Sequence, residues 1–224
     1  MCFTRPPHIL AHMHPDYTAR ERLADGIVHG LGIMACLVAL PILLAMTVPL
    51  LPAASVASLA IYAAASLAMF GFSAAYNLIP APGWKDRLRR ADQAAIFMKI
   101  AGTYTPFAVL MAGGVWSFGL FAAVWIVALS AAAAKLFLPG RLDRVSVGLY
   151  LALGWAVLLV IRPLAAALPL DALILLAVGG GLYTIGVVFH LCKRLAYQNA
   201  IWHGFVLAAA SCHYAAVLRA VTFA

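Results

Sequence analysis

Residues 26–48 read GIVHGLGIMACLVALPILLAMTV and contain no Asp, Glu, Lys or Arg. A helix that crosses the hydrocarbon core of a bilayer takes about 20 predominantly apolar residues. This stretch therefore predicts a membrane-spanning helix. Further apolar stretches of comparable length follow it, at residues 56–79, 93–112, 115–134, 145–161, 168–190 and 200–220.

The composition of the chain agrees with a protein that lies mostly in lipid. Of its 224 residues, 66% are hydrophobic and only 10% are charged, and the mean hydropathy is +1.01. A soluble domain is nearer half apolar and a quarter charged, so this composition excludes a soluble enzyme, a disordered tail and a disulfide-stapled secreted module. We predict an all-α, polytopic membrane protein, with a polar tail in residues 1–25 and a seven-helix bundle in residues 26–224. Six or eight crossings are the alternatives, because the stretches at 115–134 and 145–161 are the least distinct.

The basic residues of the chain predict its orientation. The formal net charge is +8, from 15 Lys and Arg against 7 Asp and Glu. If seven spans alternate, twelve basic residues lie on the side of the N-terminus and two on the opposite side. Since cytoplasmic loops are enriched in Lys and Arg, we expect a cytoplasmic N-terminus, an outside C-terminus and a location in the cell's inner or plasma membrane. No basic stripe with interleaved aromatic residues points to nucleic acid as a partner.

Polar residues within the spans gather at one depth, near the predicted cytoplasmic face. Polar groups in lipid are costly and commonly mark functional sites. Ser73 and Asn77 lie four residues apart and share one helix face, as do Asn199 and His203. Together with Asp92 they form a candidate polar site. The whole layer consists of Asp25, His29, Ser73, Asn77, Asp92, Gln93, His190, Asn199 and His203.

Two structural explanations compete with a functional site. Asp92 and Asn199 stand at predicted helix starts, where such residues often cap the helix. Polar side chains also hold membrane helices together through hydrogen bonds.

Lys99 falls inside the third apolar stretch, seven residues after Asp92 and on the same helix face. Helical side chains lean toward the N-terminus of their helix, so we expect the Lys99 ammonium to approach Asp92 and the polar layer. Our hypothesis is that this ammonium neutralises Asp92. The alternative is a lysine whose stem runs along lipid toward the headgroups.

Several stretches together resemble the hemolysin III family, the bacterial branch of the progestin and adipoQ receptor (PAQR) superfamily. They occur in the family's order and run through nearly the whole chain. They are Asp25-Gly-Ile-Val-His29-Gly-Leu-Gly32, Ser73-Ala-Ala-Tyr-Asn77, Asp92-Gln-Ala-Ala-Ile-Phe97, Ile100-Ala-Gly-Thr-Tyr-Thr-Pro-Phe107, and Ala200-Ile-Trp-His203 with Cys212-His213-Tyr214. The resemblance implies a seven-helix bundle with a cytoplasmic N-terminus, in agreement with the distribution of charge.

The resemblance also implies a zinc site near the cytoplasmic face. In the family, the metal is bound by a histidine four residues after a serine on the second span and by two histidines spaced H-x-x-x-H on the last span. An aspartate at the start of the third span approaches the metal through water. Ser73, Asp92 and His203 match the serine, the aspartate and the second last-span histidine. The two other ligand positions hold Asn77 and Asn199.

These two asparagines weaken the expected zinc site, because an amide oxygen is a poorer zinc ligand than a neutral imidazole. His203 and Asp92 are the metal ligands that remain, and His190 or His29 could complete the set. We therefore expect zinc to bind weakly or not at all.

Three functions are compatible with the sequence. The first is a hemolysin III-type membrane protein, cytolytic or lipid-responsive, with a modified polar site. The second is a zinc-dependent membrane amidohydrolase of the ceramidase type, with Asp92 as general base and Ser73 stabilising the oxyanion. The third is a metal-free sensor for a membrane lipid or fatty-acid-like ligand, whose carboxylate would pair with Lys99. Of these three functions, the second makes the chain an enzyme.

Overall fold

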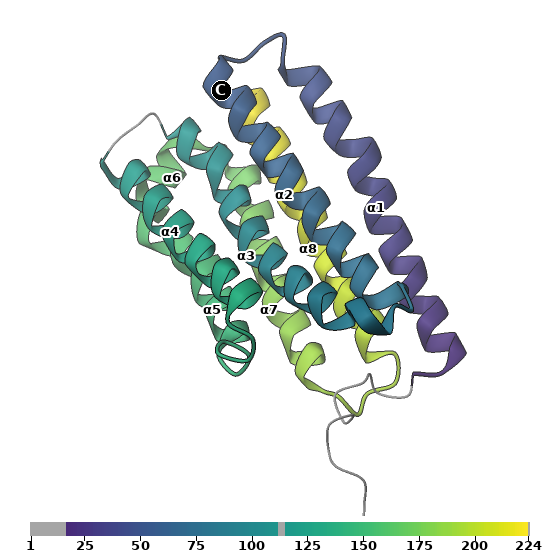
Figure 1. Cartoon of the computed structure of the whole chain (residues 1–224). Coiled ribbons are helices and arrows are strands. Elements are labelled where there is room, and N and C mark those ends of the chain that lie inside the picture. Colours follow the sequence, from purple (N-terminus) through teal and green to yellow (C-terminus); the bar gives the residue numbers. More distant parts are fainter. Residues whose placement is uncertain (1–16, 112–114, 224) are drawn as a thin grey trace, which may run out of the picture.

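The computed structural model describes residues 17–111 and 115–223, and its regular secondary structure in these ranges is entirely helical (Figure 1). The all-α class is therefore confirmed, while residues 1–16 of the predicted polar tail lie outside the described residues. The elements are α1 (Ala19–Thr47), α2 (Ala53–Leu78), the 3₁₀ turn η2 (Pro82–Trp84), α3 (Lys85–Leu110), α4 (Val115–Phe137), α5 (Ser146–Trp155), the 3₁₀ segment η3 (Ala156–Val160), α6 (Ile161–Ala167), α7 (Leu170–Leu191) and α8 (Gln198–Phe223).

Within the described ranges, 6 helical segments are long and apolar enough to cross a membrane. Five belong to α1, α2, α4, α7 and α8, and the sixth is the continuous run of α5, η3 and α6. α3 is not among these six segments, because Lys99 and three hydroxyl side chains that follow it lower its mean hydropathy. A multi-pass membrane protein is therefore confirmed, whereas the seventh crossing stays a prediction.

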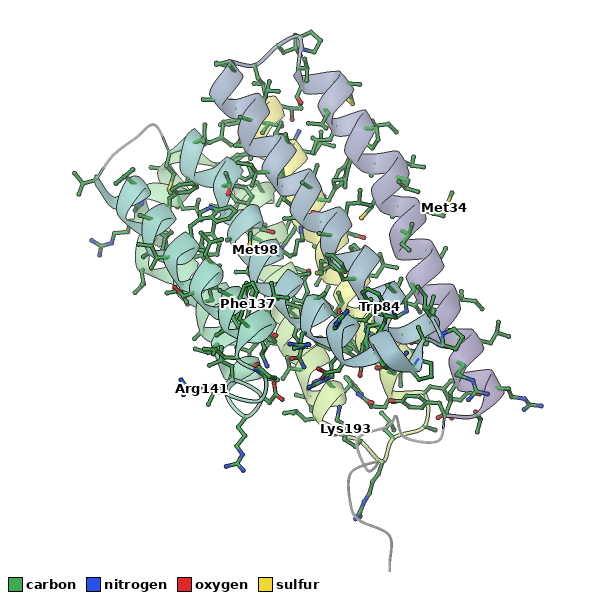
Figure 2. The ribbon with its side chains drawn as sticks, viewed as in Figure 1. Met34, Trp84, Met98, Phe137, Arg141 and Lys193 are labelled. Carbon is green, nitrogen blue, oxygen red and sulfur yellow. The ribbon has the colours of Figure 1, made fainter. Side chains whose placement is uncertain are left out.

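The bundle turns apolar side chains outward and keeps polar ones inside, which is the arrangement expected of helices in lipid. On α1, Leu31 and Met34 are more than half exposed, whereas Asp25 and His29 are buried. Figure 2 shows Met34 pointing away from the bundle. The exposed apolar faces are therefore suited to contact acyl chains, and these polar side chains lie in the interior.

Three helix limits differ from the predicted ones by more than five residues. α3 begins at Lys85, directly after η2 and eight residues before the predicted start of the third span at residue 93. α1 begins at Ala19, before the predicted start of the first span, because Thr18 and Glu21 form a capping box at its N-terminus. The fifth apolar stretch does not end at residue 161, because α6 continues the helical path to Ala167. Pro163 lies in the first turn of α6, where a missing N–H removes no helical hydrogen bond.

α3 lies inside the bundle, packed against α2, α4 and α8. Most of its residues between Ala94 and Phe107 are buried, so this helix can carry polar side chains without exposing them to lipid. Gly102 brings α3 close to α2, because a Cβ added at this position would lie 2.7 Å from the Ala65 Cβ.

Gly102→Ala is expected to lower the midpoint of thermal unfolding in detergent, because the added methyl group would overlap Ala65 and push the two helices apart. Such overpacking costs about 1–3 kcal/mol, which over most of that range exceeds the helix-propensity gain of about 1 kcal/mol. Gly71→Ala is the matched control, since nothing lies within 4 Å of its added Cβ, and it should keep or raise the midpoint. Combining Gly102→Ala with Ala65→Gly should recover most of the loss. An unchanged midpoint for Gly102→Ala alone would contradict the close contact.

Candidate functional site

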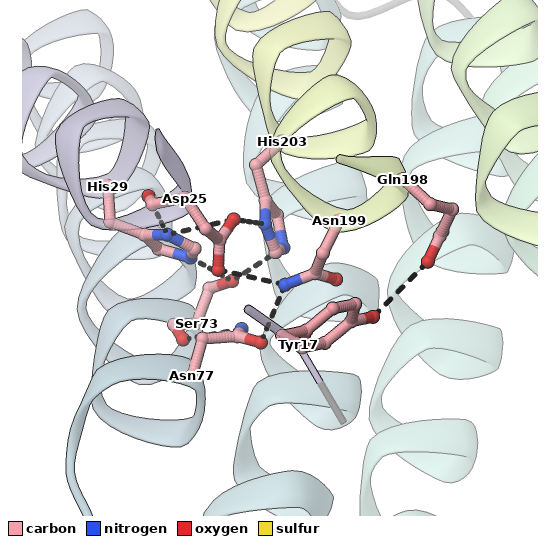
Figure 3. Close-up of polar contacts among 8 residues, drawn as sticks. All are labelled: Tyr17, Asp25, His29, Ser73, Asn77, Gln198, Asn199 and His203. Carbon is pink, nitrogen blue, oxygen red and sulfur yellow. Dashed lines mark hydrogen bonds and ion pairs between the residues drawn. The ribbon is translucent and has the colours of Figure 1, made fainter. Parts of the chain in front are cut away.

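The polar residues of α1, α2 and α8 meet at one end of the bundle, where α1 and α8 begin and α2 ends (Figure 3). Each helix contributes a pair of residues four apart, so both members of a pair face the same way. We call this group the polar cluster: Asp25 and His29 from α1, Ser73 and Asn77 from α2, and Asn199 and His203 from α8.

The Asp25 carboxylate lies at the centre of the polar cluster. Its Oδ1 accepts a hydrogen bond from Nδ1 of His203 at 2.7 Å, and its Oδ2 accepts one from Nδ2 of Asn199 at 2.8 Å. The backbone carbonyl of Asp25 accepts a third, from Nδ1 of His29 at 2.8 Å. Only 6% of Asp25 is exposed, and a buried carboxylate is stable only where donors surround it. The two contacts from Asn199 and His203 therefore join α1 to α8.

The Ser73 hydroxyl lies between the two imidazole rings. Its Oγ is 3.2 Å from Nε2 of His29 and 3.4 Å from Nε2 of His203. The rings meet edge to face, with their centroids 4.2 Å apart. Because Nδ1 of each ring donates to Asp25, Nε2 of a neutral ring is the acceptor. Both acceptors therefore point at the same hydroxyl.

The two asparagines at the expected ligand positions bond to each other. Nδ2 of Asn199 donates to Oδ1 of Asn77 at 3.0 Å, and Nδ2 of Asn77 donates to the backbone carbonyl of Ser73 at 2.9 Å. These amides are committed to hydrogen bonds within the cluster and provide no imidazole lone pair. The ligand positions implied by the family resemblance therefore do not fit zinc in this chain.

A second set of contacts fixes the start of α1 against the start of α8. Besides capping α1, the Glu21 carboxylate accepts a hydrogen bond from the backbone N–H of Tyr197 at 3.0 Å. Tyr197 has a φ of 58°, in the left-handed region that a residue with a side chain seldom adopts. The Tyr17 hydroxyl donates to Oε1 of Gln198 at 3.3 Å, and burial raises the pKa of this phenol, which keeps it a donor. We call these contacts the Glu21 clamp, and they hold the helix ends that carry the polar cluster.

A different set of residues could hold a metal ion. Within the described residues, Asp25, His29 and His203 each offer one ligand atom, and these atoms lie within 4.8 Å of one another. Two imidazoles and a carboxylate form a donor set that zinc enzymes use. Metal binding through Nδ1 would replace the hydrogen bonds to Asp25. The predicted ligand His203 belongs to this group, whereas the other predicted ligand, Asp92, does not.

Asp92 lies on α3 and lines a cavity next to the polar cluster, together with Ser73, His29 and His203. Its carboxylate is close enough to Ser73 for the two side chains to interact. The structure thus brings the predicted catalytic residues Ser73 and Asp92 to one cavity, and their catalytic roles stay predictions.

Lys99 is only 3% exposed, and its Nζ donates to Oγ of Ser66 at 2.9 Å. The ammonium also lies 4.0 Å from the centroid of the Tyr62 ring. Our hypothesis placed this ammonium on Asp92, but the structure directs it to α2 instead. The reason is reach: Asp92 is seven residues away, about 10 Å along the helix axis, while the α2 face with Ser66 packs directly on α3. The side chain does not run out to the lipid surface either.

The cavity beside the polar cluster has a volume of about 160 Å³ and extends from Ser73 past Lys99 to Thr103. A second cavity of about 120 Å³ shares Thr103 and His213 with the first and is otherwise lined mainly by apolar residues. An apolar cavity of about 150 Å³ is enough to bind benzene. The two adjoining cavities therefore offer room for a segment of an acyl chain.

Asp25 and His29 are the site residues to which the sequence pattern assigned too little weight. The pattern places them at the correct depth but outside the five-residue candidate site, because depth does not tell which helices are neighbours. The available signal was their spacing of four, the same as that of the pairs on α2 and α8. His190, the other candidate to complete a metal site, packs against the Trp202 ring with centroids 4.9 Å apart and lies outside the group.

Comparison with known proteins identifies the relatives of this chain. A family profile described as Haemolysin-III related matches residues 17–214. The "Hemolysin-3 homolog" of Bacillus subtilis (strain 168) is 33% identical over 202 residues, which cover 90% of this chain and 95% of the relative. "Hemolysin-3" of Bacillus cereus is 32% identical over 199 residues, covering 89% and 91%. The human "Monocyte to macrophage differentiation factor" is 30% identical over 129 residues, or 57% of this chain and 53% of that protein. The chain therefore belongs to the Haemolysin-III related family.

Proposed function

We propose that this chain is a multi-pass protein of the cell membrane whose internal cavity binds a single-chain lipid with a carboxylate head group. The observation that carries the proposal is Lys99, a buried ammonium at the wall of a mostly apolar cavity. Its contacts within the described chain are a hydroxyl and an aromatic ring rather than a carboxylate. A lysine inside a membrane is costly unless it is paired. A fatty-acid-like ligand would supply the missing negative charge.

The shape of the interior supports a ligand with one long chain. Lys99 and Thr103 are one helical turn apart on α3, and the second cavity begins at Thr103. A carboxylate at Lys99 would therefore send its chain away from the polar cluster and into the more apolar cavity. The polar cluster would close the opposite end of the ligand site.

We further propose that the hydrogen-bonded polar cluster takes the place of the family zinc site. Asp25 holds His203 and Asn199 in position, a structural task that a metal would otherwise perform for these side chains. The cluster is thus a modified site with its own donors and acceptors.

Membrane damage is a further candidate activity, because the two Bacillus relatives are named as hemolysins. No described helix carries charged residues along its full length, which favours lipid binding over a water-filled pore. Release of an entrapped dye from liposomes would be the sign of a lytic activity.

The topology that we propose has seven crossings, with α3 as the third, a cytoplasmic N-terminus and an outside C-terminus. The distribution of Lys and Arg supports this orientation. The buried position of α3 among apolar helices supports its crossing the bilayer with them.

A zinc-dependent amidohydrolase of the ceramidase type is the second candidate function. The donor set of Asp25, His29 and His203 favours it. Zinc held there would supply a Lewis acid, and Ser73 and Asp92 face the same cavity.

Reporter fusions are expected to confirm seven crossings. A bacterial alkaline phosphatase joined after residue 224 should be active, because the C-terminus lies outside, and green fluorescent protein joined there should be dark. The control fusion, after residue 143 in the loop between α4 and α5, should show the reverse pattern. If α3 does not cross, both fusion points change sides, and that result would contradict the proposed topology.

Lys99→Met is expected to weaken binding of oleate to the detergent-purified protein roughly 10- to 100-fold, because a charge-assisted contact contributes about 1.5–3 kcal/mol. Binding of oleyl alcohol, which has the same chain and no carboxylate, should change little. Lys193→Met is the matched control, since Lys193 is exposed in the loop between α7 and α8. The proposal fails if Lys99→Met leaves oleate binding intact or weakens both ligands equally.

Elemental analysis of the purified protein is expected to find far less than one zinc per chain, because the asparagines occupy two ligand positions and the imidazoles are hydrogen-bonded. His203→Ala and His213→Ala serve as a matched pair, since only His203 belongs to the candidate metal group. Near-stoichiometric zinc that is lost in His203→Ala and kept in His213→Ala would establish the second candidate instead.

A further inference from the structure

Ser73, His203 and Asp25 stand in the order hydroxyl, imidazole, carboxylate. The Ser73 Oγ is 3.4 Å from Nε2 of His203, and Nδ1 of the same ring is 2.7 Å from Oδ1 of Asp25. We propose that these residues form a serine nucleophile with its general base and positioning carboxylate, and that the site cleaves a long-chain acyl ester. The class of substrate rests on the proposed lipid cavity, while the reactivity of Ser73 does not.

The tautomer of His203 follows from its partners. A carboxylate only accepts hydrogen bonds, so Nδ1 of His203 carries the proton that it donates to Asp25. Asn199 bonds the second carboxylate oxygen and prevents Asp25 from turning away. Nε2 is then the unprotonated atom, and it faces Ser73. This is the orientation that a general base needs in a serine hydrolase.

His29 adds a second acceptor to the same hydroxyl. Its Nδ1 donates to the backbone carbonyl of Asp25, and its Nε2 lies 3.2 Å from Oγ of Ser73. Two ring nitrogens and the Asp92 carboxylate thus compete for the single proton of Ser73. The pair is therefore equipped to accept the proton that the hydroxyl must lose to become a nucleophile.

The chemistry balances with an ester and water as the reactants. Ser73 Oγ bonds to the ester carbonyl carbon as its proton passes to Nε2 of His203. The carbon–oxygen bond to the alcohol then breaks, and Nε2 returns the proton to the leaving oxygen. Water repeats the sequence on the acyl-serine, which releases a fatty acid and restores the hydroxyl.

The product of this reaction matches the ligand proposed for Lys99. Ser66, the hydrogen-bond partner of Lys99, lies seven residues before Ser73 on α2, about 10 Å along the helix. A fatty acid released at Ser73 would need to move about two helical turns into the cavity for its carboxylate to reach the ammonium. The fatty acid would then occupy two positions in turn, first at Ser73 and afterwards at Lys99.

A fluorophosphonate with a decyl chain tests the nucleophile on the full-length protein in detergent. We expect Ser73 Oγ to displace fluoride and form a covalent bond to phosphorus, with peptide mass spectrometry of the unmodified chain mapping the label to Ser73. Asp25→Asn should slow labelling at least 100-fold or so, because the carboxylate sets the tautomer of the base. His203→Gln should slow it by a factor of the order of 10² or more, the usual contribution of a general base.

Ser58→Ala is the matched control, since Ser58 is a buried α2 serine that bonds only within its own helix among the described contacts, and it should label as wild type. Labelling that survives 1,10-phenanthroline supports a metal-free nucleophile, and labelling that is lost with the chelator overturns it. Absence of label on Ser73, or equal rates in Asp25→Asn and wild type, also overturns the inference. Oleate binding is measured on the same wild-type preparation: binding without label overturns this inference alone, and label without binding overturns the lipid proposal alone.

Discussion

A carboxylate that is buried inside a membrane bundle needs hydrogen-bond donors from the protein, and Asp25 receives them from another helix. Asn199 and His203 both reach it from α8, so the free energy of keeping this charge buried depends on α1 and α8 staying together. The same bonds decide which ring nitrogen of His203 is available to Ser73. The Glu21 clamp repeats the connection between the two helices at the end of the bundle. The ionised Asp25 carboxylate thus fixes the positions of Asn199 and His203, and it also sets the tautomer of His203.

The fold was largely predictable because lipid imposes a simple rule on composition. Apolar runs of spanning length identified the helices, and their observed limits differ from the predicted ones by a few residues in most cases. The errors lie where local chemistry overrides the apolar pattern. At Thr18 a capping box begins α1 early, and Pro163, in the first turn of α6, was mistaken for the end of a helix. The charged segment that starts at Lys85 lies outside the apolar run, yet it forms the first turns of α3.

The sequence predicted the depth of the site in the membrane, but only some of the residues that form it. Residues four apart gave the two pairs on α2 and α8, and the structure joins them. The inclusion of Asp25 and His29 required knowing that α1 lies beside α8, which no local pattern states. The direction of Lys99 also depended on a neighbour, since the α2 surface with Ser66 is closer to it than Asp92 is. Sequence periodicity tells which face a residue occupies, and packing decides what that face meets.

The interior place of α3 has a consequence for how the chain enters the bilayer. A helix leaves the translocation channel for lipid according to its own hydrophobicity, and a central lysine opposes this step by about 2.5–3.5 kcal/mol. An α3 that crosses the membrane would therefore wait in the channel until α4 emerges, or leave it together with α2, whose Ser66 and Tyr62 shield its charge. The helices that pack against α3 in the folded bundle would then also be the ones that it needs for insertion into the membrane.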